Sequence, residues 1–226
     1  MSIRTTLSDN GLTLVFTGIF LLALGGQALV GLAMFNQDQA SAGLEAITLG
    51  QYLTSSAFAV DVTENWQSEF LQFLLFILAT VWFVQRGSPE SKPLGNAGRE
   101  SEQDQRVADS ATAESPSWSR ERGWRLAVYS RSLSLVMGSI FVLSWLAQSI
   151  TGAVAYNEEQ MRELEDPVSW AEYLALPDFW SRTLQNWQSE FLAVACMVAF
   201  SIYLRERGSP ESKPVGAPHH ATGVEG

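Results

Sequence analysis

Four long stretches of the 226-residue chain contain no charged side chain: residues 11–35, 70–84, 133–156 and 191–204. All four are mostly apolar. A soluble globule would distribute its 14 basic and 24 acidic residues over every surface helix. The pattern therefore argues against a soluble enzyme and predicts helices that cross a membrane. The net charge of −10 argues against a nucleic-acid-binding protein, which needs a basic surface.

The chain also contains an internal repeat with an offset of 121 residues. Asn-Trp-Gln-Ser-Glu-Phe-Leu at 65–71 recurs at 186–192, and Arg-Gly-Ser-Pro-Glu-Ser-Lys-Pro at 86–93 recurs at 207–214. The same offset aligns residues 10–95 with 131–216 without a gap, and 29 of these 86 positions are identical. None of the 14 positions between the two motifs matches its partner. The hydrophobic middle has diverged while its two ends were retained.

We predict an all-α membrane protein with four transmembrane helices, built as two tandem parallel helical-hairpin repeats with pseudo-two-fold symmetry. Repeat 1 covers residues 1–95, with transmembrane helices at about 11–35 and 66–85. Residues 96–117 are predicted to be a disordered cytoplasmic linker, because they have almost nothing apolar to bury. Repeat 2 covers residues 118–216, with an interfacial segment at 118–131 and transmembrane helices at about 132–156 and 187–205. Residues 217–226 are predicted to be a flexible tail.

The distribution of basic residues predicts the orientation. Loop 36–64 has four acidic residues and no Lys or Arg, and loop 157–186 has seven acidic residues against Arg162 and Arg182. The other 12 basic residues lie in the N-terminus, the linker and the C-terminal tail. The positive-inside rule places both termini and the linker in the cytoplasm and both acidic loops outside.

Two pairs of polar side chains fall where membrane helices are expected. The apolar stretches 70–84 and 191–204 are too short for a core of about 30 Å, so the preceding motif must complete each span. This places Glu69 and Glu190 about one helical turn inside the outer boundary, facing the bundle or water, because a carboxylate facing lipid is costly. Gln27 and Gln148 lie at matched depth in the other two helices. The candidate polar cleft comprises Gln27, Glu69, Gln148, Glu190, Asn65 and Asn186. A plainer interpretation stays open, in which the amides bridge helices and the carboxylates favour helix starts.

The repeated octapeptide is typical of a helix exit, because Gly suits the position after a helix and two prolines prevent its continuation. A helix stop does not require eight identical residues twice, so we also expect a docking site for a cytoplasmic partner or a clasp for a phospholipid phosphate. Plain helix termination stays open. The candidate interfacial and docking residues are Trp66, Trp187, Arg86, Lys92, Arg207 and Lys213.

Nothing in the sequence predicts catalysis. The lone Cys196 excludes a disulfide framework and a cysteine-rich metal site, and the neighbouring His219 and His220 have no evident third ligand. There is no Gly-rich phosphate loop and no Ser-His-Asp set. We therefore expect no catalytic residue, no metal site and no cofactor, and predict that the protein is not an enzyme.

The two paired motifs resemble those of an uncharacterised family of small bacterial membrane proteins, domain of unknown function family 6766. The resemblance covers nearly the whole chain except the linker and the tail. It implies a bacterial origin and residence in the plasma (inner) membrane, which the predicted four helices would cross as a multi-pass protein. It implies no activity.

The leading functional prediction is a non-enzymatic interaction, scaffold or accessory protein of the bacterial envelope, because retained ends beside a diverged middle suit a molecule recognised at its two surfaces. The alternative is a small transporter or channel for a proton, an ion or a small polar solute, which uses the paired Glu and Gln residues. Besides the lipid bilayer, the candidate partners are a membrane or cytoplasmic protein and a second copy of the chain. No nucleic acid is expected.

Overall fold

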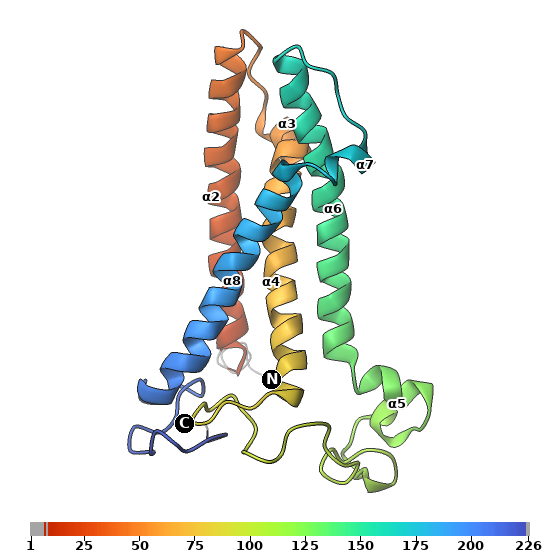
Figure 1. The fold of residues 1–226 in the computed structure, drawn as a ribbon, viewed down its shortest axis with the longest axis vertical. Helices are drawn as coiled ribbons and strands as arrows, with labels where there is room; N and C mark the ends of the chain where they lie inside the picture. The colour runs from red at the N-terminus through yellow and green to blue at the C-terminus, as the bar shows by residue number, and fades with distance from the viewer. Residues whose placement is uncertain (1–6, 8, 225–226) are drawn as a thin grey trace. The chain divides into compact units, whose positions relative to one another are not determined.

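The computed structural model describes residue 7 and residues 9–224, and every regular element in this part of the chain is helical (Figure 1). The all-α prediction is confirmed for these residues. In chain order the elements are α2 (Gly11–Ser41), α3 (Leu49–Leu53), α4 (Ser56–Trp82), the 3-10 helices η1 (Ala108–Ser110) and η2 (Ser117–Arg120), α5 (Trp124–Tyr129), α6 (Ser132–Arg162), α7 (Trp170–Tyr173) and α8 (Pro177–Tyr203).

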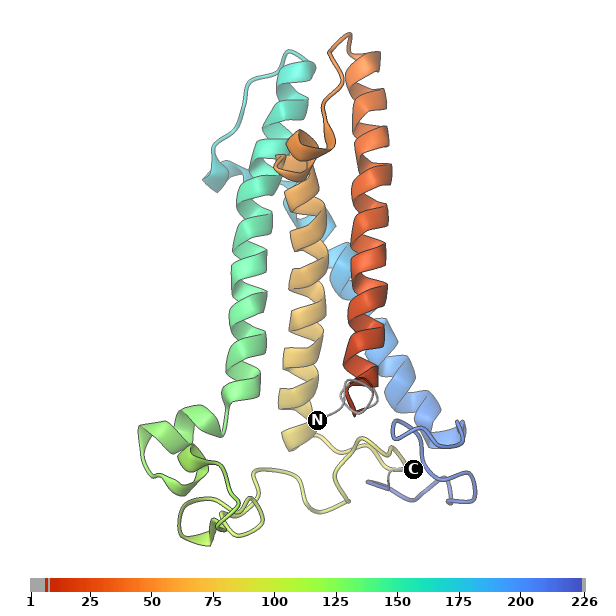
Figure 2. The ribbon, with the colours of Figure 1, turned by 180° about the vertical axis from the view of Figure 1, so that it is seen from behind.

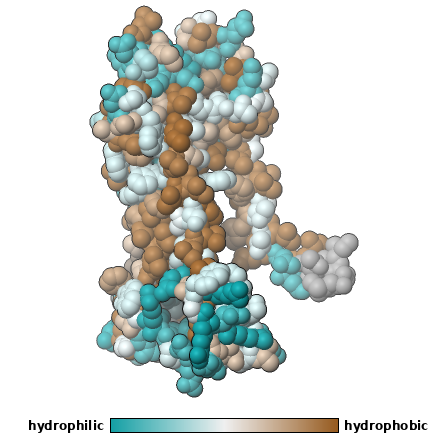
Figure 3. Space-filling model, turned by 90° about the vertical axis from the view of Figure 1, so that its right-hand side faces the viewer, coloured by the Kyte–Doolittle hydropathy of each residue, from teal (hydrophilic) through white to brown (hydrophobic). Residues whose placement is uncertain are grey.

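Two of these helices, α2 and α6, are long and apolar enough to cross a membrane. Each has 31 residues, which gives a length of about 46 Å at about 1.5 Å per residue. Their large apolar side chains are widely exposed, as at Leu12 (76%) and Leu22 (79%). Figure 3 shows hydrophobic side chains along the surfaces of the long helices and hydrophilic ones near their ends. Such exposure is unfavourable in water and suits a lipid environment.

The four long helices extend beyond their predicted bounds on the side of the acidic loops. α2 and α6 each continue six residues past 35 and 156, until Gly43 (φ 72°) and Leu164 (φ 63°) adopt left-handed backbone conformations. α4 and α8 each have 27 residues and begin ten residues before their predicted starts at 66 and 187. The start of α4 is capped by the Ser55 hydroxyl, which accepts a hydrogen bond from the amide of Phe58 at 3.2 Å. α8 starts with Pro177, whose missing N–H costs nothing in a first turn.

The described chain divides into two compact units that combine parts of both sequence repeats. One unit contains residues up to 62 and residues 147–174, so it joins α2, α3 and α7 with the end of α6. The other contains residues 63–146 and 175–224, so it joins most of α4 and the start of α6 with α8 and the segments after α4 and α8. The end of α2 and the end of α6, which are equivalent, therefore belong to the same unit, whereas the starts of these two helices do not.

In the first unit, the same side-chain bridge occurs twice at an offset of 121 residues. The amide of Asn36 donates to the carbonyl of Ile47 at 3.0 Å and accepts from its N–H at 2.8 Å. Asn157 makes the same two bonds to Val168, both at 2.8 Å. Each bridge ties the last turns of a long helix to the loop that follows it, so both loops fold back along their helices.

Each loop then forms a short capped helix that places a tyrosine against a glycine of the long helix. Thr48 caps α3 and Ser169 caps α7, each in a reciprocal pair with the residue three positions on. Tyr52 and Tyr173 are 3% and 1% exposed. A methyl group on Gly31 would overlap the hydroxyl of Tyr52, and one on Gly152 would lie 2.6 Å from the hydroxyl of Tyr173. These glycines provide the room that the tyrosines occupy.

The linker at 96–117 is a series of turns with the short helix η1 (Figures 1 and 2). Asp109 forms an ion pair with Arg122. In the predicted interfacial segment, Trp118 and Trp124 meet edge to face with ring centroids 5.9 Å apart. That the linker is disordered and that this segment lies at a membrane surface stay predictions.

We predict that Gly31→Ala and Gly152→Ala each lower the free energy of unfolding by about 1–3 kcal/mol, the usual cost of overpacking. The Tyr52 ring cannot retreat easily, because it packs between Phe35 and Phe58 with centroids 5.7 and 5.5 Å away. The matched control is Gly26→Ala on α2, where an added methyl group meets nothing within 4 Å. Thermal unfolding in detergent, followed by circular dichroism, measures the difference, and equal stability of the Gly26 and Gly31 variants would contradict this account of the packing.

Candidate functional site

The two copies of the motif at 65–71 and 186–192, here called the paired motif, lie within α4 and α8. The indole N–H of Trp187 donates to the side-chain oxygen of Gln67 at 2.8 Å, a bond that joins the two helices. Gln67 is fully buried (0% exposed), and the adjacent Ser68 is 1% exposed. In the second copy the equivalent residues, Gln188 and Ser189, are exposed. Identical motifs therefore occupy different environments.

An aromatic cluster surrounds Trp187. The ring of Trp145 on α6 lies 6.1 Å from that of Trp187 and 6.1 Å from that of Phe179 on α8. Within the described residues, the indole N–H of Trp145 and the side-chain nitrogen of Gln67 are buried without a hydrogen-bond partner. The sequence comparison could not single out Trp145, because its repeat equivalent is Leu24. Gln67 belongs to the repeated motif, but its uncharged side chain gave no reason to expect that it is buried.

The residues of the predicted polar cleft fall in both units. Glu69 is exposed and Glu190 is half-buried, and their carboxylates are near enough to repel each other. Asn65 is exposed, whereas Asn186 is half-buried and donates to the carbonyl of Arg182 at 2.9 Å.

The two glutamines of the predicted cleft belong to the other unit. Gln27 is exposed on α2, and Gln148 is 1% exposed on α6. The structure therefore brings the glutamates together, and a single cleft shared with the glutamines stays a prediction.

The repeated octapeptide forms the same turn twice, and we call residues 85–93 and 206–214 the double turn. Gly87 and Gly208 both adopt left-handed backbone conformations, with φ of 87° and 85°. Ser91 accepts a hydrogen bond from the amide of residue 85 at 2.8 Å, and Ser212 accepts one from residue 206 at 3.0 Å. These bonds satisfy backbone groups just after α4 and α8 end. The glycine and the second serine of the octapeptide thus have a structural role in each copy.

The two lysines of the double turn differ in their surroundings. Lys213 is 1% exposed, and its amino group donates to four carbonyls: Gly87 at 2.5 Å, His219 at 2.8 Å, Ala221 at 3.2 Å and Pro218 at 3.4 Å. Burial, with the nearby Arg205 cation, lowers the pKa of Lys213. Lys92 is partly exposed, donates to the carbonyl of Gly98 at 2.9 Å and pairs with Glu100 at 3.1 Å.

The C-terminal segment that accepts bonds from Lys213 also binds the first turn directly. The amide of Gly87 donates to the hydroxyl of Thr222 at 2.8 Å, and the amide of Gly223 donates to the carbonyl of Ser88 at 3.0 Å. A side chain on Gly223 would lie 2.9 Å from the carbonyl oxygen of Ser91. The segment therefore fits closely against the turn, and the flexibility predicted for residues 217–226 stays a prediction.

The surface of the double turn retains two cations. Arg86 and Arg207 are equivalent, exposed, and without an ion pair in the described part of the chain. Of the other predicted docking residues, Trp66 is 41% exposed and Trp187 is half-buried. Lys213 lies beneath the surface, where it cannot meet a partner in this conformation.

The same two turns bring a pair of equivalent carboxylates near each other. Burial and the charge of Glu211 both raise the pKa of Glu90 above its ordinary value of 4.5. Among the described residues, no group of three or more His, Cys, Asp or Glu side chains is arranged to hold a metal ion. The double turn therefore has two arginines at its surface and two carboxylates near each other.

These features define a helical protein with two helices able to cross a membrane and two copies of one basic turn. A model of the family described as "Domain of unknown function (DUF6766)" matches residues 3–224. The chain belongs to this family, which confirms the resemblance seen in the motifs. A search of curated proteins found no match. Nor did any solved structure match.

We predict that Glu90→Gln stabilises the protein at pH 7, because burial and the charge of Glu211 disfavour the charged form of the Glu90 carboxyl. A carboxyl whose pKa is raised in the folded state favours folding below its unfolded pKa of 4.5, and this contribution is lost as the pH rises through the raised value. The gain over the wild type should therefore vanish near pH 4. Unfolding curves at both pH values measure it, with Glu206→Gln, an exposed carboxylate at the first position of the second turn, as control. An equal gain at both pH values would refute the assignment.

Proposed function

We propose that this protein is a non-enzymatic scaffold or accessory protein of the bacterial envelope, recognised by a protein partner at its double turn. The exposed Arg86 and Arg207 carry the proposal. The structural needs of the turn account for its Gly, Ser and Lys residues, but not for two arginines that have no ion pair among the described residues. Exposed, equivalent arginines suit an acidic protein surface, because guanidinium groups bind carboxylates through two parallel hydrogen bonds.

The proposal includes a topology with four transmembrane helices in the bacterial plasma membrane. α4 and α8 have 27 residues each, so each extends about 40 Å, more than a core of about 30 Å requires. The positive-inside rule then places the double turn, the linker and both termini in the cytoplasm and the acidic loops outside. The paired Asn bridges and the two like turns support two tandem repeats related by pseudo-two-fold symmetry.

We expect that reversing both surface arginines, Arg86→Glu with Arg207→Glu, reduces recovery of the bound protein at least tenfold without unfolding the helices. Native mass spectrometry of the protein, extracted gently from its own membrane, measures the complex. The matched control is Arg99→Glu with Arg106→Glu, which makes the same charge change at two exposed linker positions. Undiminished recovery with the Arg86 and Arg207 variant, or a wild-type protein that carries no protein partner, would overturn the proposal.

A small transporter or channel is the second candidate function, and the proximity of Glu69 and Glu190 favours it. Two carboxylates that repel each other gain from a proton or a cation held between them. In both copies the glutamate follows Asn-Trp-Gln-Ser, so the two glutamates have the same local sequence.

If the chain transports a proton or cation, Glu69→Gln with Glu190→Gln should abolish flux into liposomes while the helical content stays unchanged. Glu163→Gln with Glu165→Gln, two exposed carboxylates after α6, is the control for the loss of negative charge. Flux is followed with a pH-sensitive dye under an imposed potential. Wild-type liposomes that leak no faster than empty ones would remove this candidate.

A further inference from the structure

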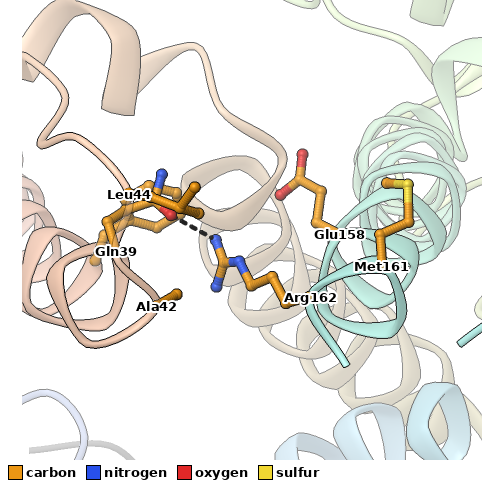
Figure 4. Close-up of a pocket in the computed structure, with 7 residues that line it drawn as sticks. Gln39, Ala42, Leu44, Glu158, Met161 and Arg162 are labelled. Carbon is orange, nitrogen blue, oxygen red and sulfur yellow. Dashed lines mark hydrogen bonds between the residues drawn. The ribbon is translucent and has the colours of Figure 1, made fainter. Parts of the chain in front are cut away.

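A cavity of about 500 Å³ lies at the last turns of α2 and α6, within one compact unit (Figure 4). Its walls include Phe35 and Gln39 of α2, Leu44 of the following loop, and Glu158, Met161 and Arg162 of α6. Figure 4 shows that Glu158 and Arg162 both extend from α6 towards the end of α2. Cavities of this size accommodate small ligands.

The surroundings of Arg162 in this cavity differ from those of Arg182, the other basic residue of the predicted acidic loops. Arg182 is held between two carboxylates, Glu64 at 3.2 Å and Asp178 at 3.5 Å. Arg162 is oriented mainly by neutral groups. It donates to the amide oxygen of Gln39 at 3.2 Å, and its guanidinium lies 5.6 Å from the centroid of the Phe35 ring.

The one carboxylate paired with Arg162 binds it weakly. Glu159 lies 3.4 Å from the guanidinium, and its side chain is 61% exposed. An ion pair so open to solvent contributes little. The guanidinium is therefore fixed in direction and still has N–H donors to offer to an anion.

Glu158 supplies the opposite charge on the same wall. Its side chain is half-buried and makes no hydrogen bond or ion pair with any described residue. A partly buried carboxylate without a partner gains when a cation reaches it. Apart from Gln39, the rest of the wall is apolar, and it includes the Phe35 ring and the exposed Leu44 (49%) and Met161 (55%).

We propose that this cavity binds a zwitterion that carries an apolar group. Its ammonium pairs with Glu158, its phosphate or carboxylate pairs with Arg162, and its apolar part covers Phe35, Leu44 and Met161. An anionic ligand leaves Glu158 without a partner, and a cationic ligand leaves Arg162 with only its exposed pair to Glu159. Either a zwitterionic phospholipid or a free amino acid with an apolar side chain has this chemistry. Phe35 ends the uncharged stretch of α2, so phospholipid head groups are within reach if α2 crosses a membrane.

The second half of the chain has the charged pair Glu158 and Arg162, and the first half has no equivalent pair. The repeat equivalents of Glu158 and Arg162 are Gln37 and Ser41, neither of which is charged. Helix α2 therefore cannot offer the same pair at its own end, and one site for each chain is expected.

The test uses the purified full chain in detergent, with native mass spectrometry for affinity and thermal unfolding as a second readout. The probes are dihexanoyl phosphatidylethanolamine, dihexanoyl phosphatidylglycerol, which is anionic and has no ammonium, and L-leucine. We expect the phosphatidylethanolamine or leucine to bind and to raise the unfolding temperature, and phosphatidylglycerol to bind at least tenfold more weakly. Binding of the phospholipid alone identifies a lipid head group as the source, and binding of leucine alone identifies a free amino acid.

Two single variants locate the site. Arg162→Gln and Glu158→Gln should each weaken binding at least tenfold, while Glu163→Gln, an exposed carboxylate on the same side of the molecule and outside the cavity wall, leaves it unchanged. If Arg162→Gln unfolds the protein, Glu158→Gln still decides, because it removes no hydrogen bond from the fold. The proposal is overturned if neither zwitterion binds, if phosphatidylglycerol binds equally well, or if both variants bind as tightly as the wild type.

Discussion

The hydrogen bonds of Asn36 and Asn157 determine where each loop folds back on its long helix. Each asparagine satisfies both backbone groups of a single residue, 11 positions further along the chain. The short capped helix that follows then brings Tyr52 onto Gly31, and Tyr173 onto Gly152. The chain turns back early, so α4 and α8 begin nine residues before the paired motif. The motif is therefore held within a helix, and the last turns of α2 and α6 project past the bridges to form a cavity.

The double turn shows how a strongly retained sequence can combine two roles. Its glycines and inner serines serve the end of each helix, because the glycines provide left-handed backbone and the serines satisfy amides just after the helix. Lys213 instead binds carbonyls of the first turn and of the C-terminal segment. The arginines at its surface serve none of these needs. Most residues between the paired motif and the double turn are apolar, and several apolar side chains can meet that requirement equally well. This difference in demand accounts for divergence in the middle and identity at the ends.

Equal sequences in the two halves do not produce equal sites. Gln67 is buried beneath Trp187, whereas Gln188 is exposed. Lys213 is enclosed by four carbonyls, whereas Lys92 reaches a carboxylate near the surface. The two halves differ most at the cavity at the end of α6, because its charged residues have uncharged equivalents on α2. Like elements recur in the two halves, and the single-copy features arise where those elements meet different neighbours.

The sequence by itself determined that the chain is helical. It also determined where α2 and α6 begin, that both are apolar, and that helices end before the Gly- and Pro-containing turns. These properties depend on side-chain polarity and backbone preference over one or two turns, which a sequence displays directly. Only the tertiary structure decided that Gln67 and Lys213 are buried, that Glu69 and Glu190 lie near each other, and that Arg162 and Glu158 share a cavity with Phe35. Burial and pairing depend on which residues from distant parts of the chain cover a given face, and two identical motifs carry the same local information whatever covers them.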